Sequence, residues 1–191
     1  MSEPDRTAAD ARIEHALRDV NSSLATAAPR ERASLLKRAG DICVGLDEPR
    51  RALAWYGRAI DQLLELGEGT DAARLCRLII FVQPNAVRAR STLTWIDLGT
   101  GRQDAAIEEL RAYAQASRVA GQNALAADQL EAMFEVATLP ALRERLVVEM
   151  RALGESARAE AMAVRLPQSP IPPSPEVLWA TVLDATIGGR R

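Results

Sequence analysis

The stretch GTGRQDAAIEELRAYAQASRVAG, residues 99–121, decides the fold of this chain. Its apolar positions recur at spacings of four, three and four residues, which predicts a helix with one inward face. That face consists of Ala106, Leu110, Tyr113 and Ser117. A tight GTGRQD turn opens the helix and Gly121 closes it.

A near copy of this stretch, GLDEPRRALAWYGRAIDQLLELG, occupies residues 45–67. A shift of 54 residues takes Gly45 onto Gly99 and Gly67 onto Gly121, and the match continues without a gap as far as Val82 and Val136. Each block of 54 residues has room for three helices with their turns, so a helix pair approaches the ~34-residue period of a helix–turn–helix repeat. The chain is therefore predicted to be built of repeats.

Composition favours packed helices and a soluble protein. The chain has 191 residues, of which 48% are hydrophobic, 26% charged and only 4% aromatic. An Ala-, Leu- and Arg-rich background with few aromatic and β-branched residues favours helices over sheets. The net charge of −2 argues against a nucleic-acid partner, because such binders usually carry a basic excess.

The cellular location is predicted from the absence of a signal peptide and of a membrane-spanning segment in the sequence. The N-terminal residues contain no apolar run typical of a signal peptide, and no later run is long enough to span a bilayer. Cys43 and Cys76 are too few for a disulfide framework and each falls on an apolar helical face. We therefore expect a cytoplasmic protein with reduced core cysteines and no membrane partner.

Four segments are expected along the chain. Residues 1–29 are predicted to be a disordered start of seven residues followed by a capping helix from Ala8. Residues 30–166 form the helical repeat domain, 167–175 a Pro-rich linker, and 176–191 a docking helix and tail. On the capping helix, one side is apolar, with Ile13, Leu17, Val20 and Leu24.

Within the repeat domain, the helix of about five turns between Gly99 and Gly121 is accompanied by helices expected over residues 30–44, 48–66, 71–82, 86–98, 123–137, 140–153 and 155–164. Asp47 and Asn85 are expected to be N-caps, because short polar side chains accept hydrogen bonds there. Gly40 lies in mid-helix, where a close helix–helix approach would justify its conformational cost. The LIIFV sequence that ends at Val82 is expected to be the most buried part.

These features resemble tetratricopeptide repeats. Repeats of that family have a large residue at position 4, Ala or Leu at position 7 and Gly at position 8. Small or aromatic residues occupy fixed positions later in the repeat. Counted from Ala33, the chain supplies Leu36, Ala39, Gly40, Ala52, Tyr56 and Ala59. Later repeats depart from the pattern, with Asp97 where a tyrosine is typical. The resemblance implies a right-handed α-solenoid of antiparallel helix pairs that binds a peptide or helix on its concave face.

Catalytic chemistry is not indicated. His15 is the only histidine and is expected on the surface of the capping helix. The glycine-containing turns lack the spacing and the lysine of a phosphate-binding loop, and no nucleophile elbow is present. We therefore expect no enzyme activity, no cofactor and no metal site.

Two groups of residues are candidates for partner binding. Arginines cluster around the turn between two helices and could hold a carboxylate, or could simply be solvated; they are Arg74, Arg77, Arg88 and Arg90. Trp55 and Trp95 flank the inward stripes, where they would be anchors for a partner if exposed and packing residues if half-buried.

The C-terminal helix, residues 176–187, is too apolar to remain undocked. Ser174 and Pro175 give it a cap and a first-turn proline, and its docking residues are Val177, Leu178, Trp179, Val182 and Leu183. It is expected to dock on its own solenoid, covering the last helices or the groove; docking on a second copy or on a partner remains open. In the groove it would compete with any peptide ligand.

The sequence therefore predicts a non-catalytic adaptor or scaffold that binds a protein or peptide, with the C-terminal helix as cap or regulator. The alternative is a structural subunit, in which this helix inserts into a neighbouring copy and builds a homo-oligomer.

Overall fold

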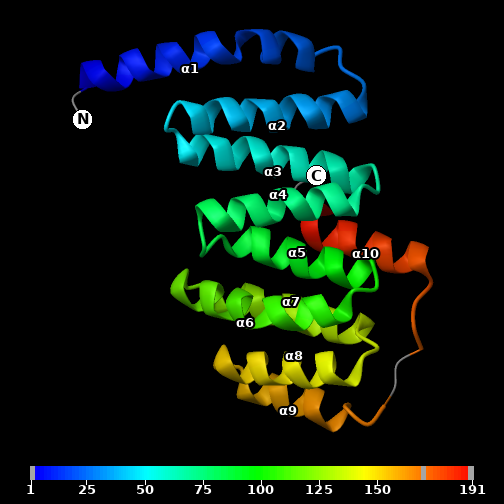
Figure 1. Ribbon diagram of the computed structural model, residues 1–191. Helices are drawn as coiled ribbons and strands as arrows, with labels where there is room; N and C mark the ends of the chain where they lie inside the picture. Colours follow the sequence, from blue (N-terminus) through cyan, green and yellow to red (C-terminus); the bar gives the residue numbers. More distant parts are fainter. Residues whose placement is uncertain (1–2, 169–170, 189–191) are drawn as a thin grey trace. The chain divides into compact units, whose positions relative to one another are not determined.

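The structure, a computed structural model, describes residues 3–168 and 171–188, with side chains described from residue 11 onward. Every regular element in these ranges is an α-helix (Figure 1). The helices are α1 (Glu3–Leu24), α2 (Pro29–Gly45), α3 (Pro49–Glu65), α4 (Gly69–Val82), α5 (Val87–Gly99), α6 (Gln103–Val119), α7 (Asn123–Val136), α8 (Pro140–Ala152), α9 (Ser156–Val164) and α10 (Pro175–Ile187). The predicted helices all form, with ends displaced by a few residues.

The N-terminal helix begins earlier than the sequence predicted. α1 starts at Glu3 rather than at Ala8, so most of the expected disordered start is helical. Its predicted inward face is buried at Ile13, Leu17 and Val20, and His15 is exposed as expected. The predictions made for residues 1–2, 169–170 and 189–191 lie outside the described residues.

The chain divides into two compact units, with the boundary inside α4. Unit 1 ends at Leu75 and unit 2 begins at Cys76. In unit 1, α2 and α3 form the most extensive helix pair, and α1 packs against α2. The two cysteines form no disulfide and are buried, one in each unit, as expected for core cysteines.

The α2–α3 pair meets at Gly40. A Cβ atom at this position would lie 2.4 Å from Cε1 of Tyr56, so only glycine lets the aromatic ring lie against the α2 backbone. The Tyr56 hydroxyl donates a hydrogen bond of 2.8 Å to Oδ1 of Asp41, and burial together with this bond raises the Tyr56 pKa. The close approach predicted at Gly40 is therefore confirmed.

Five of the helix-to-helix turns share one construction. The residue after the C-cap has a positive φ at Asp47, Gly67, Gly101, Gly121 and Gly154. In each turn the next N–H bonds back to a carbonyl five residues earlier, as Glu68 does to Leu63 at 2.9 Å and Gln122 to Ser117 at 2.9 Å. This is the Schellman motif, which ends a helix and reverses the chain within three residues.

Two predicted caps are corrected, the first by this motif. Asp47 has a φ of 60° and ends α2, while Glu48 is the N-cap of α3 and makes no side-chain cap hydrogen bond. Asp47 therefore occupies the left-handed position that Gly101 fills after α5, which a short polar side chain tolerates better than most. Asn85 is likewise not the cap of α5, which follows Ala86.

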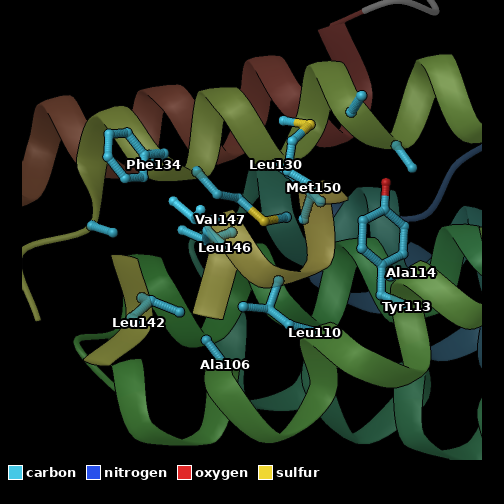
Figure 2. Close-up of a cluster of buried hydrophobic side chains, with 14 of the residues drawn as sticks. Ala106, Leu110, Tyr113, Ala114, Leu130, Phe134, Leu142, Leu146, Val147 and Met150 are labelled. Atoms are coloured by element: carbon cyan, nitrogen blue, oxygen red, sulfur yellow. The ribbon is translucent and has the colours of Figure 1, made fainter. Parts of the chain in front are cut away.

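The core of unit 2 is formed by α5 to α9 with one residue of α10. Figure 2 shows side chains of α6, α7 and α8 meeting in this core, with Leu110, Leu130 and Leu146 among them. Ala106 is fully buried, as its place on the predicted inward face requires. Small residues at such points let helix backbones approach, and the larger neighbours fill the space beside them.

α5 is the central helix of unit 2. Its residues from Thr92 to Leu98 are buried without interruption, whereas the sequence predicted only Leu93 and Ile96 inward. A helix buried on every side needs neighbours on every side, and α5 packs against α6, α7 and α10. Two of its buried polar groups are hydrogen-bonded: Thr94 Oγ1 donates to the Arg90 carbonyl at 3.0 Å, and the Asp97 carboxylate accepts a 2.7 Å hydrogen bond from Arg102.

α10 returns to pack on α5 of its own chain (Figure 1). Val182 is fully buried and belongs to the unit 2 core, and Trp179 packs against this core. Gly99, the last residue of α5, makes this approach possible, because a Cβ atom there would lie 2.7 Å from Cγ2 of Val182. The predicted cap holds as well, since Ser174 Oγ accepts a hydrogen bond from the Val177 N–H.

The burial predicted for the end of α4 is wrong. Phe81 is 86% exposed and Val82 is exposed as well, while Ile79 alone of the LIIFV residues is fully inside. An apolar run of this kind shows no periodicity, so the sequence does not show which of its faces has a neighbour.

Candidate partner-binding site

A hollow in unit 2 brings four helices together. It has a volume of about 360 Å³ and is lined by Val87, Arg88, Ser91 and Thr92 of α5, Tyr113 of α6, Leu125 and Gln129 of α7, Gln122 just before α7, and Ala185 and Thr186 of α10. We call this hollow the α10 pocket. Ligand pockets range from about 300 to 1,000 Å³, so its size suits one or two side chains of a peptide.

One wall of the α10 pocket has a fixed hydrogen-bonding direction. The Trp95 indole N–H donates a 2.6 Å hydrogen bond to Oε1 of Gln129. Because Trp95 is fully buried, it holds the Gln129 amide with the carbonyl turned inward. The Gln129 amino group is therefore the part of this amide that remains to donate into the pocket.

Tyr113 closes the pocket from the core side. Its ring is buried, and Figure 2 shows the hydroxyl directed away from Leu110. Burial raises the pKa of this phenol, against hydrogen bonds to Ser91 and Ser117. Tyr113 is therefore a neutral hydrogen-bonding group at the floor of the pocket.

The rim of the pocket has both polar and apolar side chains. Arg88 is exposed and brings a positive charge to the rim. None of the described residues that line the pocket carries a carboxylate. Leu125 adds an apolar side chain that is 57% exposed. Donors and an apolar contact thus lie next to each other.

The predicted arginine cluster is divided by the structure. Arg74 belongs to unit 1 and pairs with Asp71 of its own helix at 2.7 Å. Arg77 is exposed and lies close enough to Asp97 to lower the pKa of that carboxyl, whose pKa burial raises overall. Only Arg88 of the predicted four lines the α10 pocket.

Arg90 requires a correction. Its guanidinium pairs with the Glu109 carboxylate, and the arginine side chain is only 13% exposed. Its Nε also donates a 2.7 Å hydrogen bond to the Pro84 carbonyl. Arg90 does hold a carboxylate, as predicted for this group, but the carboxylate is one of its own chain and joins α5 to α6.

The two tryptophans have different surroundings. Trp95 is fully buried, which corrects the prediction that it could anchor a partner. Trp55 is half-buried, and the Arg58 guanidinium lies over its ring at 4.7 Å from the centroid. Of the two alternatives left open for Trp55, the packing role fits its burial.

The predicted docking residues of α10 are mostly engaged. Val182 is buried, and Leu178, Trp179 and Leu183 are half-buried. Val177 is 57% exposed, so its predicted docking role is wrong. The helix packs chiefly against α5 rather than covering the last helices, because Gly99 leaves room for it there.

A second hollow lies in unit 1 and has a mixed charge. Its volume is about 300 Å³, between α2, the end of α3 and the start of α4. Arg30 pairs with Glu68 at 3.1 Å, and Lys37 pairs with Asp41 at 2.8 Å. Because each of its basic side chains is paired with a carboxylate, this hollow shows no preference for either sign of ligand.

Sequence reasoning missed most of the α10 pocket. Tyr113 was assigned to the core stripe, and Gln129 carried no motif. The signal that was present is Leu125, a large apolar residue off the inward stripe of its helix, which includes Ala126 and Leu130. A single exposed apolar residue is common on protein surfaces, so this signal alone does not locate a pocket.

Among the described residues, no group of three or more His, Cys, Asp or Glu side chains is placed to hold a metal ion. None of the described helices has the length and apolar character needed to cross a membrane. Comparison of the chain with protein-family models, with curated proteins and with solved structures finds no match.

Proposed function

We propose that this protein is a non-catalytic interaction adaptor, built as a tetratricopeptide-like α-solenoid and acting in the cytoplasm, which binds a segment of another protein. The repeat supports this proposal: a shift of 54 residues carries α3 onto α6 and α4 onto α7 with identical bounds. Three-residue Schellman turns form five of the connections between successive helices, as repeating hairpins need.

The α10 pocket is the observation that carries the binding role. Hydrogen-bond donors and an exposed leucine from separate helices meet in a hollow of side-chain size. Protein segments present carbonyl groups and apolar side chains together, so such a site suits a peptide. The C-terminal helix acts as cap or regulator, since Ala185 and Thr186 of α10 form part of the wall.

Site-specific photo-crosslinking in cells of the source organism tests this role. A photoreactive amino acid at Leu125, on the pocket rim, should give an adduct with another protein. The control is the same amino acid at Val148, which is also apolar and exposed but lies on α8 outside the pocket. Equal adducts from both positions, or none from Leu125, would contradict an adaptor that binds through this pocket.

The second candidate is a structural subunit. α10 is joined to α9 through the Pro-rich residues 167–174 and makes its main contacts with one helix, α5. A neighbouring copy could supply the same helix to the same surface. Light scattering over a range of concentrations separates the two: an adaptor keeps the mass of one chain, whereas α10 exchange gives a mass that rises with concentration.

A further inference from the structure

We infer that unit 1 has a docking site of its own, on α2 and the adjoining hollow, for a helix of a partner protein. This partner helix lies on α2 as α10 lies on α5, with an apolar side chain against Gly45 and polar side chains over the hollow. The site shares no residue with the α10 pocket, so the inference goes beyond the proposed function.

The hollow of unit 1 is the repeat counterpart of the α10 pocket. In unit 2, Ala185 and Thr186 of α10 complete the wall. In unit 1, the described lining residues come from α2, α3 and α4 and from Glu68 just before α4, so none of them takes the place of α10. Six lining residues of the two hollows correspond under the shift of 54 residues: Ala33 to Val87, Ser34 to Arg88, Lys37 to Ser91, Glu68 to Gln122, Asp71 to Leu125 and Leu75 to Gln129.

Gly45 marks the point where the partner helix meets α2. It is the last residue of α2, as Gly99 is the last residue of α5, and neither glycine has a positive φ. At Gly99 a Cβ atom would lie 2.7 Å from Cγ2 of Val182, so α10 requires the glycine. At Gly45 a Cβ atom would meet no atom within 4 Å. Alanine would favour the helix more than glycine does, and a docked partner helix accounts for the glycine.

The side chains beside Gly45 are apolar and exposed. Val44 is 47% exposed and Leu46 is 40% exposed, whereas Leu98, the counterpart of Val44, is buried in the unit 2 core. A helix that packs here gains free energy from the apolar surface removed from water. The partner helix therefore presents a branched or aromatic side chain to Gly45, as α10 presents a valine to α5.

The next turns of the partner helix are polar. Three corresponding positions are neutral in the α10 pocket and charged in unit 1: Ser91 becomes Lys37, Gln122 becomes Glu68 and Leu125 becomes Asp71. Burying such groups against apolar side chains costs free energy, because their hydrogen bonds to water are lost. The helix that covers this hollow therefore carries polar side chains in place of Ala185.

The partner helix comes from another protein rather than from α10. In this chain α10 packs on α5, with Val182 in the unit 2 core and Ala185 packed against that core. Moving α10 to α2 would give up these contacts and place Ala185 over charged groups. The α10 of a second copy has the same contacts in its own chain, so it gains nothing by the exchange.

The test uses the full chain and a fluorescent helical peptide with blocked ends. The peptide has the sequence of residues 174–187 with Gln in place of Ala185, and a hydrocarbon staple joins positions 180 and 184, which are exposed on α10. Gln supplies the polar turn and hinders docking on α5, where Ala185 packs against the core. Fluorescence anisotropy should show saturable binding, and weaker binding of the peptide that keeps Ala185. No binding, or tighter binding of the Ala185 peptide, would overturn the inference.

Two substitutions locate the peptide on α2. Gly45→Ala should lower its affinity about tenfold by overpacking the contact. The melting temperature should not fall, because the new Cβ meets no atom of the chain. Val44→Asp should also weaken binding, while the control Val119→Asp, at an exposed valine of α6, should not. Unchanged affinity in Gly45→Ala or Val44→Asp, or an equal loss in Val119→Asp, would overturn the inference.

Two further measurements separate the other occupants. The Trp179 indole N–H signal of the chain should stay at its docked position while the unlabelled peptide is added; movement to the exposed position would show that the peptide displaces α10 instead. Light scattering of the chain alone should show no dimer that Gly45→Ala abolishes, since such a dimer would make a second copy the occupant. Either contrary result overturns the inference and leaves the α10 pocket, which the Leu125 crosslink tests separately.

Discussion

Gly99 and Val182 are in contact at the point where α10 meets α5: a Cβ atom on the glycine would come within 2.7 Å of Cγ2 of the valine. Trp179 lies against the same spot, with Cε3 at 3.1 Å from that position. Val182 is stiff at χ1 and Trp179 is bulky, so neither can give way at small cost. The absence of one methyl group on α5 thus allows the C-terminal helix to dock.

Gly99→Ala is therefore expected to weaken or release α10. Overpacking of this kind costs about 1–3 kcal/mol, and the free energy gained by a docked terminal helix is of limited size. The indole N–H signal of Trp179 in a ¹⁵N–¹H spectrum should move to the position of an exposed tryptophan. Gly45→Ala is the matched control and should leave the spectrum of α10 unchanged, since a Cβ there meets no atom within 4 Å.

Gly40→Ala should destabilise unit 1. Its Cβ would lie 2.4 Å from the ring of Tyr56, so α2 and α3 would have to separate or the ring would have to turn. We expect a loss of about 1–3 kcal/mol in the free energy of unfolding, measured by urea titration. In a Tyr56→Ala background the same substitution should no longer destabilise. An equal loss in both backgrounds would show that the ring is not what requires glycine.

Ala106→Leu should destabilise unit 2 by about 1–3 kcal/mol, because the residue is fully buried in a core without spare volume. Ala124→Leu is the control: Ala124 is exposed on α7, so the added atoms have room. Melting temperatures of the two variants compare directly. An unchanged melting temperature for Ala106→Leu would disprove the packing assigned to α6.

Asp97 predicts a pH dependence with a definite sign. Burial raises its pKa, against the lowering effects of Arg102 and Arg77, so the folded state holds this proton more tightly than the unfolded state. Its contribution to stability is thus fully present below the ordinary pKa of aspartate and is lost as the pH rises through the folded-state pKa. The Asp97→Asn variant has no carboxyl group to ionise at this position. Its free energy of unfolding relative to the parent chain should therefore improve as the pH rises from the ordinary pKa of aspartate through the raised pKa of Asp97.

Glu135 gives a pH dependence of stability with the opposite sign. A side-chain hydrogen bond from Arg165 lowers its pKa, so its contribution is present above the ordinary glutamate pKa and is lost as the pH falls through the folded-state pKa. Glu135→Gln should therefore be less stable than the parent at neutral pH, with a difference that closes on acidification. Urea unfolding across the acid-to-neutral range measures both variants. Parallel curves for all three proteins would contradict the assigned environments.

The sequence predicted helices and turns well because the turn signals are local. Gly67, Gly101, Gly121 and Gly154 all take positive φ values, and each ends a helix at the predicted place within a residue or two. Asp47 was misassigned because aspartate is favoured at N-caps and is also tolerated in the left-handed region. Only the five-residue hydrogen bond from Glu48 to Cys43 decides between these roles.

The candidate site was harder to predict because it depends on packing between distant segments. Gln129 gains its hydrogen-bonding direction from Trp95, which is 34 residues away. Ala185 reaches the pocket only because Gly99 admits α10, and the sequence does not show which helix α10 covers. Arg90 was predicted to bind a partner but is not available, because it pairs with Glu109 of the next helix and is largely buried there.

The most direct test of the account follows the indole N–H signals of Trp95 and Trp179 together while the partner segment captured by the Leu125 crosslink is titrated into the full chain. Trp95 reports on Gln129 through their hydrogen bond, and Trp179 reports on the docking of α10. We predict that the Trp95 signal moves with saturation while the Trp179 signal stays at its docked position. A Trp179 signal that moves to the exposed position while Trp95 remains unchanged would show that the ligand displaces α10, and would contradict the account.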